Sequence, residues 1–415
     1  MRFLNPILLV LGWAVTRLLL VRQSFGRHRW IFGDVHYYFS EILKERSGQV
    51  ALKEYPEANL WLIRLIDHFA PDSQTSIEYS YVGFILVLDF LFFLLLLRRG
   101  HRLASWFWVA FGLVVGPIYL TRLDLIPGLL VGVFAYLLAR HQKLAAAFLG
   151  AATMMKLWPG VLAAVLVGHF KSLQSWLRIA AFGGTMVVMA LITTLTLGFD
   201  RLLSPLSYQG ERGLQIESVA ATPFMVLAST GGGGYRISYA PSKSFEVVGP
   251  GVATATQVAS LALYAVVLFA AFILLRRLTS LTWRASESVA LAVVLTVAML
   301  VTNKVFSPQY IVWLAPIFAV ALCFSKSPKL RQAAVLVLVI TWLTQLIYPA
   351  NYTTLMTNDP DFLPTLLLTL RNAAMILLMV LSLQWWRWET RQPLAAVHNP
   401  PEAALHGRHR EAIQH

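Results

Sequence analysis

Apolar residues dominate this chain in long runs, and short polar connections separate the runs. About twelve runs are long enough, or nearly so, to be helices that cross a membrane, which takes about 20 residues each. The predicted spans are residues 3–20, 79–97, 103–120, 124–139, 143–156, 158–170, 178–198, 253–275, 286–302, 308–324, 331–348 and 364–385. The runs between residues 103 and 170 are short, which indicates tilted, broken or protein-buried helices there.

The composition agrees with this pattern, because 57% of the 415 residues are hydrophobic, only 13% are charged, and the mean hydropathy is +0.64. Soluble domains carry about 25% charged residues. The sequence therefore predicts an all-α polytopic membrane protein. The first apolar run is too long for the apolar part of a signal peptide, so we interpret it as a span. The single cysteine, Cys323, excludes a disulfide framework.

Lysine and arginine are unevenly distributed between the two sides of the predicted bundle. Basic residues occupy the short connections at 98–102, 140–143, 171–178, 276–284 and 326–331, all on one side. Basic loops remain in the cytoplasm, so both termini are predicted to be cytoplasmic in a multi-pass protein of the cell membrane. Most carboxylates map to the outer side. The net charge of +14 therefore reflects membrane topology, and no nucleic-acid partner is expected.

Residues 1–385 are predicted to form one membrane domain with two long outer loops, 21–78 and 199–252. Residues 34–46 and 59–69 of the first loop have the apolar spacing of helices lying at the membrane interface. Residues 386–415 are expected to be a disordered basic tail in the cytoplasm. The inner connections are too short to hold a nucleotide, and no Gly-rich phosphate loop with its lysine occurs. Any chemistry is therefore expected at the outer face, without a cofactor.

Polar residues of unusual chemistry gather where spans meet the outer face. Asp34 follows the first span and either caps the helix that follows or acts as a general base at a cavity mouth. Tyr37 beside it is a candidate to contact substrate. His36 is either an interfacial histidine or a residue that orients Asp34 or contacts a sugar hydroxyl.

Two further outer junctions carry charged candidates. Arg122 and Asp124 lie in a tight turn, where one interpretation is an ion pair between them. The alternative is that Arg122 binds a phosphate and that Asp124 orients Arg122 or a sugar. Lys156, in the segment MKLWPG, either extends its ammonium along the helix to water or contacts substrate. Lys304, with Gln309 nearby, opens the tenth span and is suited to a phosphate.

The second outer loop has a polar cluster, which is either solvated or part of a binding site. Its members are Gln209, Glu211, Arg212, Gln215, Glu217 and Ser218, and Glu217 is the candidate to contact substrate. A short apolar helix is predicted directly after it, at residues 219–228. Within the spans, Arg17, Asp89 and Arg371 are costly unless they are paired or face water, and one arginine is expected to pair with Asp89.

Several of these segments together resemble glycosyltransferase family 87, a family of the GT-C type. The resemblance rests on GDVHYY at 33–38, EYP at 54–56, TRLD at 121–124, MKLWPG at 155–160, QIES at 215–218 and NKVFSPQYIVWL at 303–314. It covers most of residues 1–385. The best-known members of this family are α-1,2-mannosyltransferases of phosphatidylinositol mannoside synthesis, which use polyprenyl-phosphate-mannose.

The resemblance implies a hexosyltransferase whose cavity opens to the outer leaflet. Polyprenyl-phosphate-mannose would be the donor and a glycolipid or lipoglycan the acceptor. Asp34 would be the base, and Lys304, with Arg122 and Lys156, would bind phosphate. Asp34 lacks the adjacent carboxylate of the metal-binding acidic pair found in some GT-C enzymes, so metal-independent inverting transfer is expected. Two alternatives stay open, namely an arabinofuranosyltransferase using polyprenyl-phosphate-arabinofuranose, and a lipid or solute transporter without chemistry.

Overall fold

The computed structural model describes the chain apart from residues 1–3, 27–28, 71–72, 99–100, 211 and 393–415. The described part is mostly helical, and seven of its helices are long and apolar enough to cross a membrane. These are α1 (Leu4–Phe25), α4 (Gln74–Arg98), α9 (Leu173–Leu197), α12 (Val252–Thr279), α13 (Ala285–Thr302), α15 (Pro328–Ile347) and α17 (Phe362–Thr390). A helical protein suited to a multi-pass membrane location is thus supported, whereas the expected count of about twelve spans is not.

The other expected spans are short helices. Residues 102–165 form α5 (Arg102–Val114), α6 (Ile118–Thr121), α7 (Leu125–Leu137), α8 (Gln142–Met155) and the 3-10 helix η2 (Trp158–Val165). The run 308–324 is divided into the 3-10 helix η4 (Pro308–Trp313) and α14 (Leu314–Phe324). At 1.5 Å per residue α14 is only about 16 Å long, and residues 314–322 are all buried. Protein therefore surrounds this helix where the hydropathy pattern predicted lipid.

Proline determines where several of these elements begin. Pro159, Pro308 and Pro328 stand in the first turns of η2, η4 and α15. A helix tolerates proline in its first turn because the N–H groups there have no partner within the helix. The apolar runs are thus divided at these prolines, and each division leaves an irregular segment next to it, which is where candidate residues such as Lys156 and Lys304 lie.

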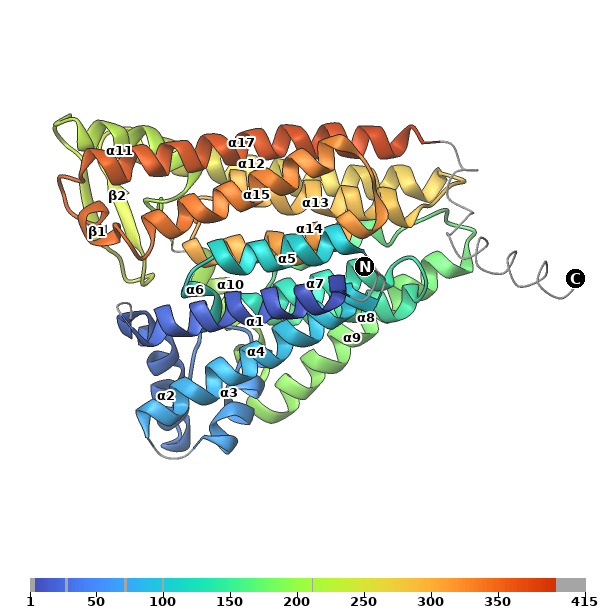
Figure 1. Cartoon of the computed structure of the whole chain (residues 1–415), viewed down its shortest axis with the longest axis horizontal. Coiled ribbons are helices and arrows are strands. Elements are labelled where there is room, and N and C mark those ends of the chain that lie inside the picture. The colour runs from blue at the N-terminus through green and yellow to red at the C-terminus, as the bar shows by residue number, and fades with distance from the viewer. Residues whose placement is uncertain (1–3, 27–28, 71–72, 99–100, 211, 393–415) are drawn as a thin grey trace, which may run out of the picture.

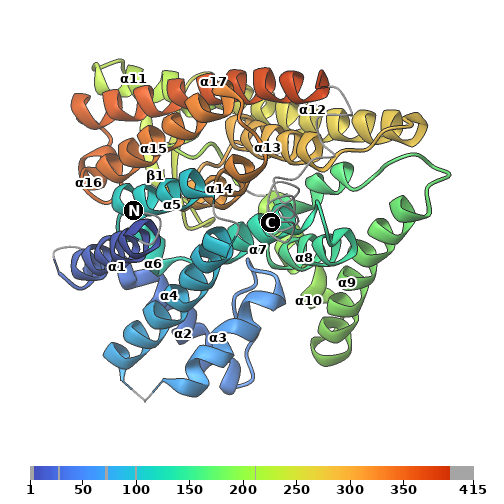
Figure 2. The ribbon, with the colours of Figure 1, turned by 45° about the vertical axis from the view of Figure 1, so that its right-hand side comes forward.

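The helices form two layers joined by a buried centre (Figure 1). One layer contains α12, α13, α15 and α17, and the other contains α1, α4, α8 and α9. Helix α14 packs against α5 and α7 on one side and α13 and α15 on the other, so it connects the layers. The same two layers are seen after a 45° turn (Figure 2).

Smaller elements cover one end of the bundle. They are η1 (Arg29–Phe32), α2 (Gly33–Arg46), α3 (Glu57–Phe69), α10 (Phe199–Gly210), η3 (Val219–Ala221), α11 (Thr222–Ser229) and α16 (Tyr352–Leu355), with the strands β1 (Arg236–Tyr239) and β2 (Phe245–Val248). Helices α2 and α3 confirm the helices predicted at residues 34–46 and 59–69, and η3 with α11 confirms the helix predicted at 219–228. The antiparallel hairpin, in which Arg236 pairs with Val248, was not predicted.

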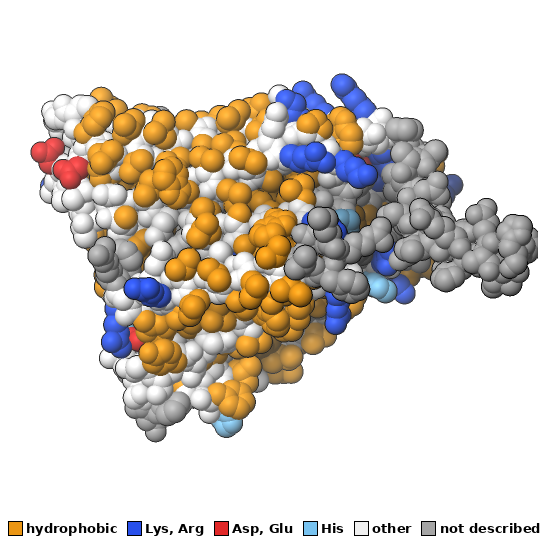
Figure 3. Space-filling model, viewed as in Figure 1, with side chains coloured by type: hydrophobic (Ala, Val, Ile, Leu, Met, Phe, Trp, Pro, Cys, Tyr) orange, Lys and Arg blue, Asp and Glu red, His pale blue; other side chains and the backbone are white. Residues whose placement is uncertain are grey.

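Charge divides the surface as the sequence indicates. On the face drawn in Figure 3, apolar side chains cover the middle, Lys and Arg gather mainly at the right-hand end, and the most prominent carboxylates lie at the left-hand end. The left-hand end carries the hairpin, α2 and α11 (Figure 1). By the positive-inside rule the right-hand end is the predicted cytoplasmic side. Helix α17 extends to Thr390, so the predicted tail begins later than expected, and residues 393–415 lie outside the described part.

A buried polar cluster joins α1, α4, α5 and α6 inside the apolar region. Asp89 accepts two hydrogen bonds from the Arg17 guanidinium, at 2.8 and 2.9 Å. Trp13, Trp108 and Tyr119 donate three more to the same carboxylate, at 2.8, 2.7 and 2.6 Å. Arg17 is therefore the partner that the sequence predicted for Asp89. A buried ion pair stabilises a fold only when its remaining hydrogen-bonding groups are satisfied, as they are here.

Replacing Asp89 with leucine is expected to lower the free energy of unfolding by about 3–5 kcal/mol, because it leaves the Arg17 charge buried without a partner. A denaturant titration of the detergent-solubilised protein measures the loss. The double variant Asp89→Leu/Arg17→Met is expected to recover part of it, since no unpaired charge remains. The exposed Asp359 provides the control Asp359→Asn. An Asp89→Leu variant as stable as this control would show that the cluster contributes little.

Candidate functional site

A cavity of about 1570 Å³ lies at the end of the structure that carries α2 and the hairpin. Its walls come from α2 and the turn after it, the 118–161 region, the hairpin, helix α12, and the segments around 303–313 and 348–356. Pockets for small ligands are usually 300–1,000 Å³, so this cavity has room for more than one sugar. Six of the nine predicted site residues line it, namely Asp34, Tyr37, Arg122, Lys156, Lys304 and Gln309.

Asp34 projects into the cavity from the first turn of α2. The residue before the helix, Phe32, makes no side-chain cap, so the alternative that Asp34 is the N-cap is wrong. Arg122 Nε lies 2.8 Å from Asp34 Oδ2, and the Asp34 side chain is still 43% exposed. Because Oδ2 faces Arg122, Oδ1 is the oxygen available to a substrate. The carboxylate is thus anchored on one side and open to the cavity on the other.

Arg122 is buried and fixed by contacts to three parts of the chain. Its Nη1 donates to the Ile31 carbonyl at 3.0 Å, and its Nη2 donates to the Tyr348 hydroxyl at 2.9 Å. The predicted turn pair with Asp124 does not form, because Arg122 faces Asp34 instead. Arg122 therefore positions the carboxylate of Asp34, which leaves its guanidinium less available to a phosphate than the sequence suggested.

Asp124 and Lys156 form a second ion pair. The ammonium of Lys156 contacts Asp124 Oδ1, and Trp313 Nε1 donates to the same oxygen at 2.9 Å. Lys156 lies at the end of α8 in extended backbone, which the break before η2 allows. Asp124 is buried and does not line the cavity itself. It acts on the cavity through Lys156 and Trp313, which both line it.

Lys304 differs from these cations because no carboxylate of the described residues lies within ion-pair distance of it. It stands between α13 and η4, where its backbone carbonyl accepts from the Gln215 amide at 3.1 Å. Partial burial lowers the pKa of its ammonium, and Glu246 offsets part of that effect. An anion bound beside it would stabilise the charged form. Asn303 and Gln309 line the cavity close to it in sequence.

Tyr37 lies under the tip of the hairpin. Its hydroxyl donates to Glu54 Oε1 at 2.5 Å, and burial together with Glu54 raises its pKa. The ammonium of Lys243, from the hairpin turn, contacts the same hydroxyl and lies 3.4 Å from Glu54 Oε1. The hairpin thus reaches across the cavity to the first outer loop, and Tyr37 is held in the wall as a neutral phenol.

Besides Asp124, two predicted site residues do not line the cavity, namely His36 and Glu217. The His36 ring contacts α4, where Glu78 Oε1 lies 2.8 Å from its Nε2 and the Gln74 side-chain amide 3.0 Å from its Nδ1. This is the plain interfacial histidine that the sequence left as one alternative. Glu217 is fully buried behind Tyr352, which lines the cavity. Of its cluster, Gln215 and Arg212 line the cavity, whereas the side chain of Gln209 and residue Glu211 lie outside the description.

Glu217 belongs to a buried polar group beside α17. Arg371 Nη2 lies 3.6 Å from its carboxylate and donates to its backbone carbonyl at 2.7 Å. Asn372 donates to the same carbonyl at 3.4 Å. Burial raises the pKa of the Glu217 carboxyl to about 7, although Arg371 and Tyr352 favour its charged form. The carboxyl therefore takes up a proton near neutral pH.

This burial is expected to make stability depend on pH. Between pH 4.5, the ordinary value, and about 7, folded Glu217 keeps a proton that the unfolded chain releases. The free energy of unfolding therefore falls by about 3 kcal/mol as pH rises through this window and changes no further above it. The neutral variant Glu217→Gln should lack this fall. Denaturation midpoints of both proteins at pH 5 and pH 8 test it, and an equal pH dependence would be the contradictory result.

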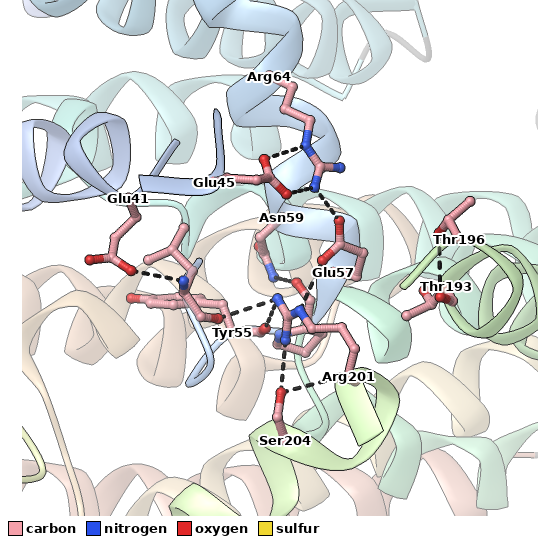
Figure 4. A network of polar contacts seen from close by, with 12 residues as sticks. Glu41, Glu45, Tyr55, Glu57, Asn59, Arg64, Thr193, Thr196, Arg201 and Ser204 are labelled. Atoms are coloured by element: carbon pink, nitrogen blue, oxygen red, sulfur yellow. Dashed lines mark hydrogen bonds and ion pairs between the residues drawn. The ribbon is translucent and has the colours of Figure 1, made fainter. Parts of the chain in front are cut away.

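A polar network supports the cavity wall at Tyr55 (Figure 4). Arg201 of α10 pairs with Glu57 at 3.0 Å and donates to the Tyr55 carbonyl at 3.0 Å. Arg64 of α3 pairs with Glu57 at 2.7 Å and donates to Glu45 of α2 at 3.0 Å. Helices α2, α3 and α10 are thereby held together, and the turn that carries Tyr55 is fixed between them.

Sequence reasoning missed several residues of the site. Tyr348, Tyr55 and Lys243 line the cavity. The Tyr348 hydroxyl accepts a hydrogen bond from Arg122, and Lys243 donates to the Tyr37 hydroxyl. The Tyr55 hydroxyl bonds that of Tyr38, the neighbour of Tyr37. Tyr348 and Tyr352 occur in YPANY, directly after an apolar run at the outer side, which was a usable signal. Trp313 was treated only as part of a span, although its indole nitrogen bonds Asp124.

Neither a family model nor a curated protein nor a solved structure matches this chain. The resemblance to glycosyltransferase family 87 therefore rests on the short motifs alone. Among the described residues, no group of three or more His, Cys, Asp and Glu side chains is arranged to hold a metal ion. What the site offers is an anchored carboxylate, a cation without a carboxylate partner, and aromatic walls.

Proposed function

We propose that this protein is an inverting glycosyltransferase of the GT-C type. It moves mannose from polyprenyl-phosphate-mannose to a hydroxyl of a glycolipid or lipoglycan on the outer face of the membrane, in an α-1,2 linkage. One observation carries this proposal. A single large cavity contains both an open carboxylate, Asp34, and a cation without a carboxylate partner, Lys304, and its wall includes a helix suited to lipid.

Asp34 is the general base in this reaction. Its Oδ1 takes the proton of the acceptor hydroxyl as that oxygen attacks the anomeric carbon of the donor. Arg122 pairs with Oδ2, so the carboxylate keeps one orientation while Oδ1 accepts the proton. The contacts of Arg122 to Ile31 and Tyr348 fix the guanidinium in turn. Preorganisation of this kind lowers the barrier, because the group does not have to reorient during the reaction.

Lys304 stabilises the leaving group. The bond from the anomeric carbon to the phosphate oxygen breaks as the new bond forms, and polyprenyl phosphate departs with the electron pair. Its added negative charge needs a cation, and Lys304 is the lining lysine without an ion-pair partner in the described structure. Attack from the face opposite the phosphate inverts the anomeric carbon, so a β-linked donor gives an α-linked product.

The lipid chain of the donor is proposed to lie along α12. Leu263 and Tyr264 of this helix face the cavity, whereas Val258, Leu261 and Leu268 are more than half exposed. An apolar helix exposed on one side and lining a cavity on the other suits a ligand with a long hydrocarbon tail. A water-soluble sugar nucleotide has no hydrocarbon chain that could pack against this apolar wall.

Purified protein in phospholipid vesicles tests the proposal. Radiolabelled β-linked polyprenyl-phosphate-mannose is supplied with an alkyl α-mannoside as acceptor, and polyprenyl-phosphate-arabinofuranose is supplied in a parallel sample. We expect label from the mannose donor in the acceptor. Transfer of arabinofuranose alone would replace the proposed sugar. Movement of the lipid across the vesicle membrane without transfer from either donor would contradict the proposal and favour a transporter.

A further inference from the structure

Lys156 is set among aromatic rings in the cavity wall. Its Nζ lies 4.8 Å from the centre of the Tyr310 ring and 5.2 Å from that of Trp313. Trp158 stacks on Trp313 with ring centres 4.8 Å apart and an interplanar angle of 16°. Tyr310 stacks on the same ring at 4.1 Å and 18°. Lys156, Trp158, Trp313 and Tyr310 all line the cavity.

This wall carries little net charge. Asp124 contacts the Lys156 ammonium, and Trp313 Nε1 donates to the same carboxylate oxygen at 2.9 Å. A phosphate placed here would therefore compete with a buried carboxylate for one ammonium. A neutral ligand avoids that conflict, because it can accept a hydrogen bond from Lys156 while the ion pair to Asp124 stays intact.

The same wall holds a polar group without a partner. Trp158 is 6% exposed, and its Nε1 is buried with no hydrogen-bond partner in the described structure. A buried donor without a partner is costly, and its position in a cavity wall suggests that a ligand or water supplies the acceptor. Indole and phenol rings with polar atoms at their edges suit a molecule that has both C–H faces and hydroxyl groups.

Tyr55 connects this wall to the proposed base. Its hydroxyl lies within 3.4 Å of the Tyr38 hydroxyl, and its ring centre is 5.9 Å from Lys156 Nζ. The charges of both Asp124 and Asp34 act on the Tyr55 phenol. Tyr55 thus lies between the Lys156 wall and Tyr38 of α2, the helix that also carries Asp34.

We propose that Lys156, Trp158, Trp313 and Tyr310 form a subsite for a neutral sugar ring, and that Lys156 donates to a sugar hydroxyl rather than to phosphate. This inference rests on the proposed function and adds to it a division of labour among the cations. Lys304 binds the phosphate, Arg122 positions Asp34, and Lys156 with Asp124 orients the sugar. The sugar is that of the donor or that of the acceptor.

Binding measurements with two lipids test this subsite. Affinities of polyprenyl-phosphate-mannose and of polyprenyl phosphate without sugar are measured for wild type, Trp158→Phe and the charge-neutral pair Lys156→Met/Asp124→Asn. Trp158→Phe keeps an aromatic ring that can stack on Trp313 and removes the indole N–H together with its five-membered ring. Both variants should bind the mannose-bearing lipid about tenfold more weakly and polyprenyl phosphate as wild type does, since one hydrogen bond to a ligand is lost. Lys304→Gln should lower the affinity for both lipids by the same factor.

The outcomes separate the subsite from the function. If donor affinity is unchanged but the acceptor KM rises about tenfold, the ring in this subsite is that of the acceptor, and the proposal of a sugar subsite stands. The sugar subsite is wrong if the Lys156→Met/Asp124→Asn and Trp158→Phe proteins lose affinity for both lipids equally. It is also wrong if neither the donor affinity nor the acceptor KM changes. In both cases the proposal of a transferase stands. If wild type binds neither lipid, both proposals are wrong.

Discussion

Asp34→Asn is expected to lower kcat for mannose transfer by a factor of about 10² to 10⁴, the usual contribution of a general base. Asparagine has nearly the same shape and keeps an oxygen toward Arg122, but it cannot accept the proton of the acceptor hydroxyl. The donor does not depend on this carboxylate for its phosphate contacts, so the donor KM should stay within about twofold of the wild-type value. A loss in kcat alone indicates a group that acts only in the transition state.

Steady-state rates with labelled donor in vesicles measure this effect, and Asp359→Asn is the matched control. Asp359 is an exposed carboxylate outside the cavity, so its replacement should leave kcat unchanged. A denaturation midpoint for each protein verifies that Asp34→Asn is folded despite the altered contact with Arg122. An Asp34→Asn protein that retains more than about a third of wild-type kcat would remove Asp34 from the role of base.

Lys304→Gln is expected to lower kcat by about 10² to 10³, the effect of removing one group that stabilises developing charge. It should also raise the donor KM, because the phosphate already carries charge before the reaction. Glutamine retains an N–H donor without the positive charge. The effect should be large because no carboxylate of the described residues forms an ion pair with Lys304 that would mask its charge.

The salt dependence of the donor KM provides a second measure, since the charge contact of wild type weakens as ionic strength rises. In Lys304→Gln this dependence should be smaller. Lys53→Gln is the control, because Lys53 is exposed in the first outer loop and does not line the cavity. Equal kcat and equal salt dependence in wild type and Lys304→Gln would show that the phosphate binds elsewhere.

Much of the candidate site was predictable because the membrane sorts residues by side. Asp34, Arg122, Lys156 and Lys304 each stand where an apolar run ends, and the charge pattern assigns all four ends to one face. Residues confined to one face of a bundle are brought close together whatever the exact packing. Their common cavity therefore follows from topology, without knowledge of the individual contacts.

The pairing within the site was not predictable from local sequence. Arg122 is two residues from Asp124, yet it faces Asp34, and Asp124 faces Lys156. The carboxylate with which each cation pairs depends on how α2, α6 and α8 pack. The sequence between these helices does not predict that packing. The roles of Arg122 and Lys156 changed for this reason, from phosphate ligands to a positioning residue and a proposed sugar contact.

The predicted number of about twelve spans is not confirmed, for a related reason. Hydropathy measures how apolar a segment is, but a helix buried by protein and a helix buried by lipid are equally apolar. Helix α14 and most of α7 belong to the first kind. The hairpin was missed because its strands have four residues each and neither alternates regularly in burial. Its length leaves too few positions for a period-two pattern to stand out.

The anomeric configuration of the first product tests the account most directly. Purified wild-type protein receives β-linked polyprenyl-phosphate-mannose labelled with ¹³C at the anomeric carbon, and nuclear magnetic resonance reads the linkage in the product. A single displacement with Asp34 as base and the phosphate leaving from the opposite face predicts an α-mannoside. A β-mannoside would require two displacements or another geometry, and the absence of any mannosylated product would contradict transfer in this cavity altogether.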